Sequence, residues 1–462
     1  ANDNTAVGRD SLKTNVTGYN NTAVGSFALT DNTAQNNTAV GKNALKVNTS
    51  GGENTAIGTS ALDANTTASN NTAVGYDALT ANTTGTLNTA VGAYALDANT
   101  TADNNTAVGY GSLSTNTTGT QNVAVGTQAL LANTTGNNTV ALGFRALEDN
   151  TTGSSNTALG TTTLNSCTTG SKNISIGHGS LEVLTTGESN VGIGYNCLNA
   201  NTVSKNTAVG FESLKVNTTG ANLCAFGAHA LDANTTAANN TGLGFHALTA
   251  NTTGSDNTAV GKSTCENNTT GIQGVAVGSG ALEKNTTANY NTAVGCIALY
   301  ANTTGTQNTA IGRAALTLNT TASENTAVGM NAMVSNTTGG SNTAVGTFAL
   351  DANTTSSNNT AIGFNALTAQ TTGVQNNGLG SYSLQSNTTG AHNVGLGYNS
   401  LGSNTTGTYN IAIGNYALDS NTTANNNVAV GYDALGSNTT GAELVAVGGD
   451  ALKNNTTGGY NV

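Results

Sequence analysis

The stretch NTAVGAYALDANTTADN, residues 88–104, is one copy of a unit that repeats along the whole chain. Its glycine, Gly92, returns in 27 copies, and 24 of the 26 intervals between successive copies are 17 residues long, the other two being 16. We number the unit from position 1 (Asn88) to position 17 (Asn104), so that Gly92 stands at position 5. Such strict periodicity indicates a repeat architecture in which each unit stacks on its neighbours.

The composition agrees with this interpretation and argues against several classes of protein. Leu keeps one phase, at position 9, in 25 of the 27 copies, which a disordered chain would have no reason to do. Charged residues make up only 8% of the 462 residues, and the net charge is −11 with the basic residues scattered singly, which argues against a nucleic-acid partner. No apolar run is long enough to span a membrane, so we expect no membrane insertion.

The repeat runs from the first residues to the last without a linker or a Pro. We therefore expect one continuous solenoid domain over residues 1–462, without an internal boundary and without caps. A chain whose ends carry ordinary repeat sequence is expected either to be a piece of a longer protein or to have its ends covered by neighbouring molecules.

Positions 2, 3 and 4 have the alternation of a β-strand. Position 4 is Val, Ile or Leu, and once Phe226, while position 2 is mostly Thr with several Val and Ile substitutions such as Val123. Because both positions accept branched apolar residues, the pattern predicts that they face inward together.

Position 3 is Ala in most copies and otherwise Ser or Gly, as at Ala90, Ser175 and Gly192. A solvent-facing strand position would normally accept Lys, Glu or Arg, yet none occurs here. The sequence therefore predicts that position 3 faces outward against another chain, most simply a second copy. The residues expected to line this contact include Ala73, Ala90, Ala107, Ala327 and Ala344.

The rest of the unit predicts a second extended piece and two turns. Leu at position 9 is expected in the core, for example Leu147, Leu248 and Leu350. The variable positions 6 and 7 are expected in solvent. Position 12 is mostly Asn and becomes Cys167, Leu184 and Gln370 in three copies. Because the position accepts Leu, its Asn is expected to point inward and form a ladder with its copies in neighbouring coils. The Thr-Thr-Gly that follows is typical of a turn.

These features predict an all-β parallel β-solenoid of about 27 coils, one per 17-residue repeat. With strands about 4.8 Å apart, it would be a thin rod with one Val and one Leu in the core of each coil. So small a core suggests that the chain associates with others.

The phrase Asn-Thr-Ala-Val-Gly, as at residues 105–109, resembles the repeats in the heads of trimeric autotransporter adhesins. The longer unit in residues 71–85 is similar to repeats in bacteriophage tail-fibre shafts. The resemblance covers the whole chain, although the autotransporter repeat is shorter and no coiled-coil stalk, membrane anchor or chaperone domain is visible. It implies a left-handed solenoid and a homotrimer.

No residues form a convincing catalytic, cofactor or metal site. The glycine pairs at Gly192/Gly194 and Gly395/Gly397 have no helix to follow, as a dinucleotide loop requires. The four histidines are at variable outward positions: His178, His229, His246 and His392. Acidic residues recur at position 10: Asp63, Asp97, Asp232 and Asp351. A uniform rod offers these carboxylates no cleft, so we expect no enzyme.

Five cysteines lie at five different positions of the repeat: Cys167, Cys197, Cys224, Cys265 and Cys296. Neighbouring coils bring only equivalent positions within disulfide distance. We therefore expect small apolar substitutes rather than a disulfide ladder. The frequent Asn-x-Thr triplets are interpreted as turn chemistry rather than glycosylation sites.

The repeat thus favours a structural role: a fibre or adhesin shaft, extracellular, at the cell surface or on a virion, that spaces or presents a binding tip. Self-association is expected as a homotrimer or an end-to-end filament, and any host-surface receptor would be bound by parts outside this chain. Two alternatives stay open, an ice-binding β-solenoid, because regular Thr on a flat sheet can order water, and a self-assembling cell-surface filament.

Overall fold

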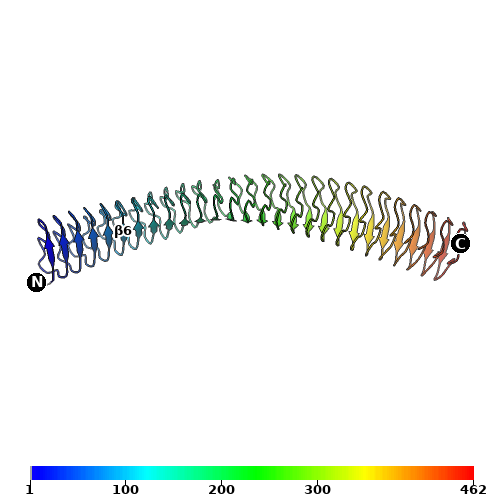
Figure 1. The fold of residues 1–462 in the computed structure, drawn as a ribbon, viewed down its shortest axis with the longest axis horizontal. Coiled ribbons are helices and arrows are strands. Elements are labelled where there is room, and N and C mark those ends of the chain that lie inside the picture. Colours follow the sequence, from blue (N-terminus) through cyan, green and yellow to red (C-terminus); the bar gives the residue numbers. More distant parts are fainter. Residues whose placement is uncertain (1–2, 462) are drawn as a thin grey trace. The chain divides into compact units, whose positions relative to one another are not determined.

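The structure is a computed structural model that describes residues 3–461. It is an all-β parallel β-solenoid of about 26 turns with a repeat of about 17 residues. Each coil contributes one three-residue strand, formed by positions 2–4, and Figure 1 shows one strand arrow per coil. The chain divides into two compact units, Ala1–Ala228 and His229–Val462, which are described separately.

In the first unit the strands follow one another in chain order: β1 (Thr5–Val7), β2 (Thr22–Val24), β3 (Thr38–Val40), β4 (Thr55–Ile57), β5 (Thr72–Val74), β6 (Thr89–Val91), β7 (Thr106–Val108), β8 (Val123–Val125), β9 (Val140–Leu142), β10 (Thr157–Leu159), β11 (Ile174–Ile176), β12 (Val191–Ile193), β13 (Thr207–Val209) and β14 (Cys224–Phe226). Neighbouring strands pair in parallel and in register, so that Ala90 of β6 lies opposite Ala107 of β7.

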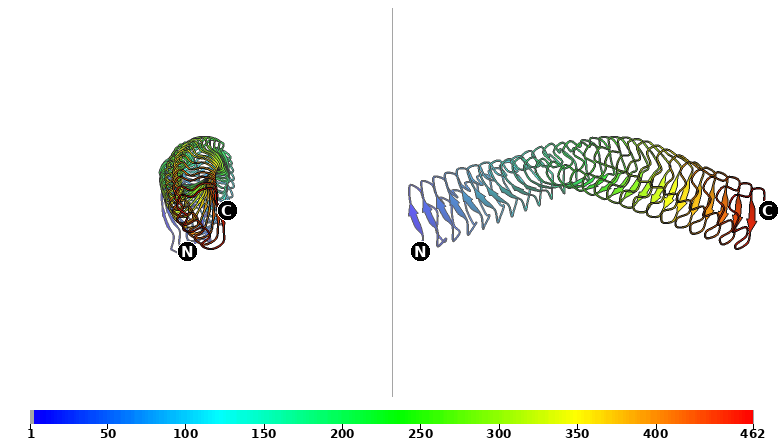
Figure 2. Two further views of the ribbon diagram at one scale, coloured as in Figure 1. Left: turned by 90° about the vertical axis from the view of Figure 1, so that its right-hand side faces the viewer. Right: turned by 45° about the vertical axis from the view of Figure 1, so that its right-hand side comes forward.

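The second unit repeats this arrangement: β15 (Thr241–Leu243), β16 (Thr258–Val260), β17 (Val275–Val277), β18 (Thr292–Val294), β19 (Thr309–Ile311), β20 (Thr326–Val328), β21 (Thr343–Val345), β22 (Thr360–Ile362), β23 (Asn377–Leu379), β24 (Val394–Leu396), β25 (Ile411–Ile413), β26 (Val428–Val430) and β27 (Val445–Val447). Here Ala310 lies opposite Ala327 in the same parallel register. Within each unit the strands stack along one side of the coils and the turns form the other sides (Figure 2).

The strands face the opposite way from the sequence-based expectation. Ala90 and Ala107 at position 3 are fully buried in their own solenoid, whereas Val91 and Ile57 at position 4 are 36% and 41% exposed. The predicted Val core and the predicted Ala contact between chains are therefore wrong. The alternation itself was correct, because successive strand residues do face opposite sides.

The reason is the narrow interior of each coil. At Gly242, a position-3 residue, an added Cβ would lie 3.4 Å from Leu231 Cδ1 of the preceding coil and 3.4 Å from the Ala247 carbonyl oxygen. A methyl group fills this space at van der Waals distance. Ser175, the one larger residue at this position, fits because its hydroxyl donates to the Ser180 carbonyl oxygen at 2.9 Å. The limit to small residues thus comes from the chain's own Leu row and not from a partner.

The Leu row at position 9 is confirmed as core. Leu147, Leu248 and Leu350 have no exposed surface. Ala at position 8 is buried beside them, for example Ala146. Burial of each Leu is worth about 1.5–3 kcal/mol, so this row supplies most of the apolar stabilisation of a coil.

The predicted second extended piece is absent from the described residues. The segment after the position-5 glycine instead alternates in backbone handedness, with φ of 53° at both Asp77 and Leu79. Its backbone still bonds to neighbouring coils, since Leu79 N donates to Ala95 O at 3.0 Å and Asp77 N donates to Thr59 O at 3.1 Å. The coil therefore has one strand, and turns stacked by hydrogen bonds complete it.

Two rows of buried asparagines hold the turns together. At position 12, Asn82 Nδ2 donates to Asn65 Oδ1 of the preceding coil at 3.1 Å and to Gly85 O at 2.9 Å, which confirms the predicted ladder. Position 1 forms a second row that the sequence analysis missed: Asn71 N donates to Asn54 Oδ1, and Asn71 Nδ2 donates to Gly85 O, both at 2.9 Å. The position-15 carbonyl oxygen therefore accepts both asparagines of its coil.

The two 16-residue coils keep this arrangement and lose one residue of the turn. In the first, Ala34 O accepts Asn21 Nδ2 and Asn32 Nδ2, each at 2.9 Å. In the second, Val203 O accepts Asn190 Nδ2 and Asn201 Nδ2 at 2.9 and 2.8 Å. The missing residue lies between positions 12 and 15, where the shorter turn still brings the same acceptor between the two asparagines.

Candidate interaction surfaces

The outward face of each sheet is the most uniform surface of the molecule. It consists of two rows of side chains. The position-2 row is mostly Thr, with Val and Ile and the single exceptions Cys224 and Asn377, and the position-4 row is Val, Ile or Leu with Phe226 as the exception. No residue of either row is charged in any of the described strands, and many are substantially exposed, such as Leu142 at 41% and Leu396 at 42%. Positions 2 and 4 therefore exclude charged residues, as position 3 does, although their side chains are exposed. We call these two rows the sheet face.

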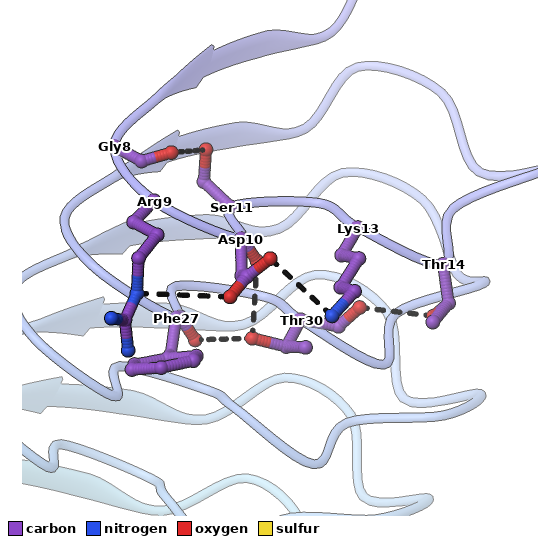
Figure 3. A network of polar contacts seen from close by, with 8 residues as sticks. All are labelled: Gly8, Arg9, Asp10, Ser11, Lys13, Thr14, Phe27 and Thr30. Atoms are coloured by element: carbon purple, nitrogen blue, oxygen red, sulfur yellow. Dashed lines mark hydrogen bonds and ion pairs between the residues drawn. The ribbon is translucent and has the colours of Figure 1, made fainter.

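Charged side chains lie instead on the turn segments. In the first coil the Asp10 carboxylate forms ion pairs with Arg9 at 3.8 Å and with Lys13 at 3.3 Å (Figure 3). The Arg9 guanidinium also lies 4.5 Å from the centre of the Phe27 ring. Thr30 Oγ1 donates to the Asp10 and Phe27 carbonyl oxygens at 3.2 and 2.8 Å. Since the Arg9 and Lys13 side chains are 72% and 61% exposed, each ion pair is worth at most about 1 kcal/mol.

Aromatic side chains form rows at positions 6 and 7. In the first unit the Tyr94 ring is edge-to-face with Tyr76 at 5.4 Å and with Tyr110 at 5.8 Å. In the second unit five successive coils continue such a row: Phe364, Tyr382, Tyr398, Tyr416 and Tyr432. These positions were expected in solvent, and Tyr110 is indeed 56% exposed. Edge-to-face pairs of this kind add about 0.5–1.5 kcal/mol each.

One aromatic row borders a surface hollow of about 310 Å³ in the first unit. Its lining consists of Tyr94, Asp97, Tyr110, Gly111, Ser114, Gln128 and Leu131. Gly111 is at position 7, where the neighbouring coils carry Tyr94 and Gln128. A Cβ on Gly111 would meet only Leu131 Cδ1, at 3.6 Å, so the missing side chain opens the hollow.

A second hollow, of about 510 Å³, lies over the turns next to the first 16-residue coil. It is lined by Thr17, Gly18, Thr33, Ala34, Gln35, Ser50, Gly52, Glu53, Ser69 and Asn70. The shorter turn of that coil accounts for its position. Its lining is polar and has no aromatic ring, so it offers less for a specific ligand than the hollow at Gly111.

The cysteines are all free and fall into two groups. Cys167, Cys197 and Cys265 are buried, and burial raises their thiol pKa to about 11, about 12 and about 12. Cys296 is exposed, and Cys224, on the sheet face, is half-buried. The expectation against a disulfide ladder is therefore confirmed, and the first three cysteines occupy buried space as small apolar substitutes.

The other residues considered above are engaged in local contacts. His229 Nδ1 lies 3.3 Å from Asp232 Oδ2, and His246 Nδ1 lies 3.5 Å from Glu266 Oε1. His392 stacks on Tyr409 at 4.7 Å. Within residues 3–461 no three His, Cys, Asp or Glu side chains come close enough to share a metal ion.

The remaining candidates also have structural explanations. Gly192 and Gly395 are position-3 strand residues, and Ser383 Oγ donates to Gly395 O at 2.9 Å. The position-10 acids Asp63 and Asp351 are half-buried, and burial raises the pKa of both carboxyl groups. No helix in the described part of the chain is suited to crossing a membrane.

No protein-family model matches this chain, and the search of curated proteins finds no match for it. We therefore infer a function from the surfaces described above.

Proposed function

We propose that this protein is the shaft of a fibre or adhesin, an extracellular or virion-borne structural rod, and that its copies associate through the sheet face. The observation that carries the proposal is the absence of charge from both outward rows throughout the described strands, while charged residues occur freely on the turns. The likeness of the repeat to tail-fibre shafts and adhesin heads supports a left-handed homotrimer, with any receptor bound by other parts of the fibre.

The physical basis is the regular geometry of the face. Equal repeats give two copies the same axial spacing, so one row of branched side chains can pack along another in every coil. A side chain such as Ile311, 40% exposed in the described chain, would contribute up to about 1 kcal/mol when covered. Summed over many coils, this exceeds the entropy lost on association.

The test replaces Val74, Val108 and Val125 together with Lys. These residues are on the sheet face, so each Lys is accommodated in a single chain but would be buried unpaired in an assembly. We expect light scattering to give a multiple of 45.6 kDa for the natural chain and the monomer mass for the variant.

The matched control places Lys at the exposed position-6 residues Thr59, Thr127 and Thr161, where Lys42 and Lys262 already occur. It should stay associated. A monomeric natural chain, or a sheet-face variant that stays associated, would contradict the proposal. A mass that rises steadily with concentration would favour the self-assembling filament.

A second candidate, ice binding, is favoured by one observation. Thr at position 2 faces outward, and seven successive coils carry it, from Thr5 to Thr106. Such a face would bind ice only when bare. If this candidate is correct, we expect the chain to be monomeric and to show thermal hysteresis. Replacing Thr55, Thr72 and Thr89 with Lys should then reduce the hysteresis. No hysteresis at high protein concentration would remove it.

A further inference from the structure

The hollow at Gly111 combines aromatic and polar groups in a compact space. Two tyrosine rings border it, and a carboxylate, an amide and a hydroxyl lie around them. Ligand sites commonly combine an apolar or aromatic surface with a few polar groups in this way. The hollow lies on turn segments, so its accessibility does not depend on what covers the sheet face.

Several of its polar groups are free to bind a ligand. Asp97 Oδ1 accepts Ser114 Oγ at 2.6 Å, and Gln128 Oε1 accepts Arg145 Nε at 3.3 Å. Among the described residues no protein partner is recorded for Asp97 Oδ2, for Gln128 Nε2 or for the Tyr110 hydroxyl. The hollow therefore presents an acceptor, a donor and a hydroxyl that can act as either.

The exposed tyrosine rings indicate what the apolar part of the ligand is. Tyr94 and Tyr110 are 36% and 56% exposed. The face of a tyrosine ring carries negative charge density and attracts weakly positive C–H groups. A ligand that contacts both the rings and the polar groups needs a patch of C–H groups on one face and hydroxyls around its edge. A pyranose sugar has this arrangement.

The charge of the residues that line the hollow favours a neutral sugar over an acidic one. Asp97 is its only charged residue, and no Lys or Arg lines the hollow. An acidic sugar would be repelled by the carboxylate, whereas neutral hydroxyls can donate to it. The volume of about 310 Å³ is at the lower end for ligand pockets and suits a single ring, and its open sides leave room for a longer chain.

We propose that the hollow formed by Tyr94, Asp97, Tyr110, Gly111 and Gln128 binds a neutral hexose unit of a glycan. The sugar stacks on Tyr110, the more exposed of the two perpendicular rings, donates a hydroxyl proton to Asp97 Oδ2 and accepts from Gln128 Nε2. The observations that support this site do not depend on the proposed shaft function, and a shaft that carried the site would bind glycans along its own surface.

The test uses saturation-transfer NMR of the full chain with the methyl glycosides of glucose, galactose, mannose and N-acetylglucosamine. We expect transfer to at least one of them and at least a tenfold loss of affinity in Gly111→Asn. Asn suits the positive φ of 61° at this position and already occupies position 7 at Asn43 and Asn365, so the variant fills the hollow without altering the fold.

Gly280→Asn is the matched control, because Gly280 is also at position 7, with φ 66°, and has no tyrosine pair beside it. It should bind as the natural chain does. Tyr110→Phe should keep most of the binding and Tyr110→Ala should lose it, since stacking needs the ring. Absence of transfer from all four glycosides, or equal binding by Gly111→Asn and Gly280→Asn, would overturn the proposal.

Discussion

At the scale of the residue, the glycine at position 5 is the least replaceable part of the repeat. Gly75 has φ of 145°, and a Cβ there would lie 2.4 Å from the Gly92 carbonyl oxygen of the next coil. A side chain would thus be strained by its own backbone and would also separate two coils. This double restriction explains why all 27 copies keep the glycine.

We expect Gly75→Ala to destabilise its own and the adjoining coils by at least about 2 kcal/mol, measured by hydrogen exchange. Gly242→Ala is the control, because its Cβ would meet neighbours at 3.4 Å and Ala occupies this position in most coils. It should stabilise by about 0.4–1 kcal/mol through the unfolded state. Equal destabilisation by both variants would contradict the geometric explanation.

The cysteines give a second test at this scale. The thiolate is the reactive form, and burial raises the thiol pKa to about 12 in both Cys197 and Cys265. At pH 8 a thiol reagent should label Cys296 rapidly in the native protein, whereas Cys167, Cys197 and Cys265 should react only after denaturation. Rapid labelling of Cys265 in the native chain would show that position 9 is not core.

At the scale of the element, the position-12 ladder is interrupted where Cys167 and Leu184 replace Asn. Asn150 Oδ1 is left buried without a partner in the described structure, directly below Cys167 in the row. An orphaned buried acceptor costs about 1–3 kcal/mol. The interruption therefore marks a weak point in the row.

Cys167→Asn alone should leave the free energy of unfolding nearly unchanged. The new amide would donate to Asn150 Oδ1, but its own oxygen would be left without a donor next to Leu184. Adding Leu184→Asn joins the ladder from Asn150 to Asn201. We therefore expect a favourable coupling of about 1–2 kcal/mol between the two substitutions in a double-mutant cycle of denaturant unfolding. Cys167→Asn combined with Gln370→Asn, in the other unit, should be additive, and strict additivity in the first pair would argue against the ladder.

At the scale of the whole molecule, each interior coil of a unit is stabilised by the coils before and after it. The stability of such an array is a sum of coil and interface terms, so its register matters more than its length. Asn71 and Asn88 hold equivalent places in successive coils, which makes one repeat a removable part.

Deletion of residues 71–87, one whole repeat, should leave the far-UV circular dichroism per residue and the unfolding midpoint almost unchanged. Deletion of residues 71–78 removes half a repeat and takes Leu79 out of the Leu row. It should lose cooperative unfolding in the surrounding coils. Similar behaviour of both deletions would mean that register does not hold the solenoid together.

The period, the strand at positions 2–4, the Leu row and the position-12 ladder could all be predicted from the sequence, because each leaves a repeated chemical pattern in a single chain. The sequence could not determine which face of the strand is inside. Thr-Ala-Val alternates equally well in either sense, and the small size of Ala suits a narrow core as well as a close contact between chains.

Tertiary structure decided that question through the Leu row. Leu231 of one coil leaves only the space of a methyl group at position 3 of the next, so Ala turns inward and the branched residues turn outward. The hollow at Gly111 is likewise a product of stacking, since Tyr94, Tyr110 and Gln128 belong to three successive coils. Side chains that are 16 residues apart, such as Tyr94 and Tyr110, or 18 residues apart, such as Tyr110 and Gln128, become neighbours only when the coils stack. The spacing of a repeat does not show which of its variable positions meet.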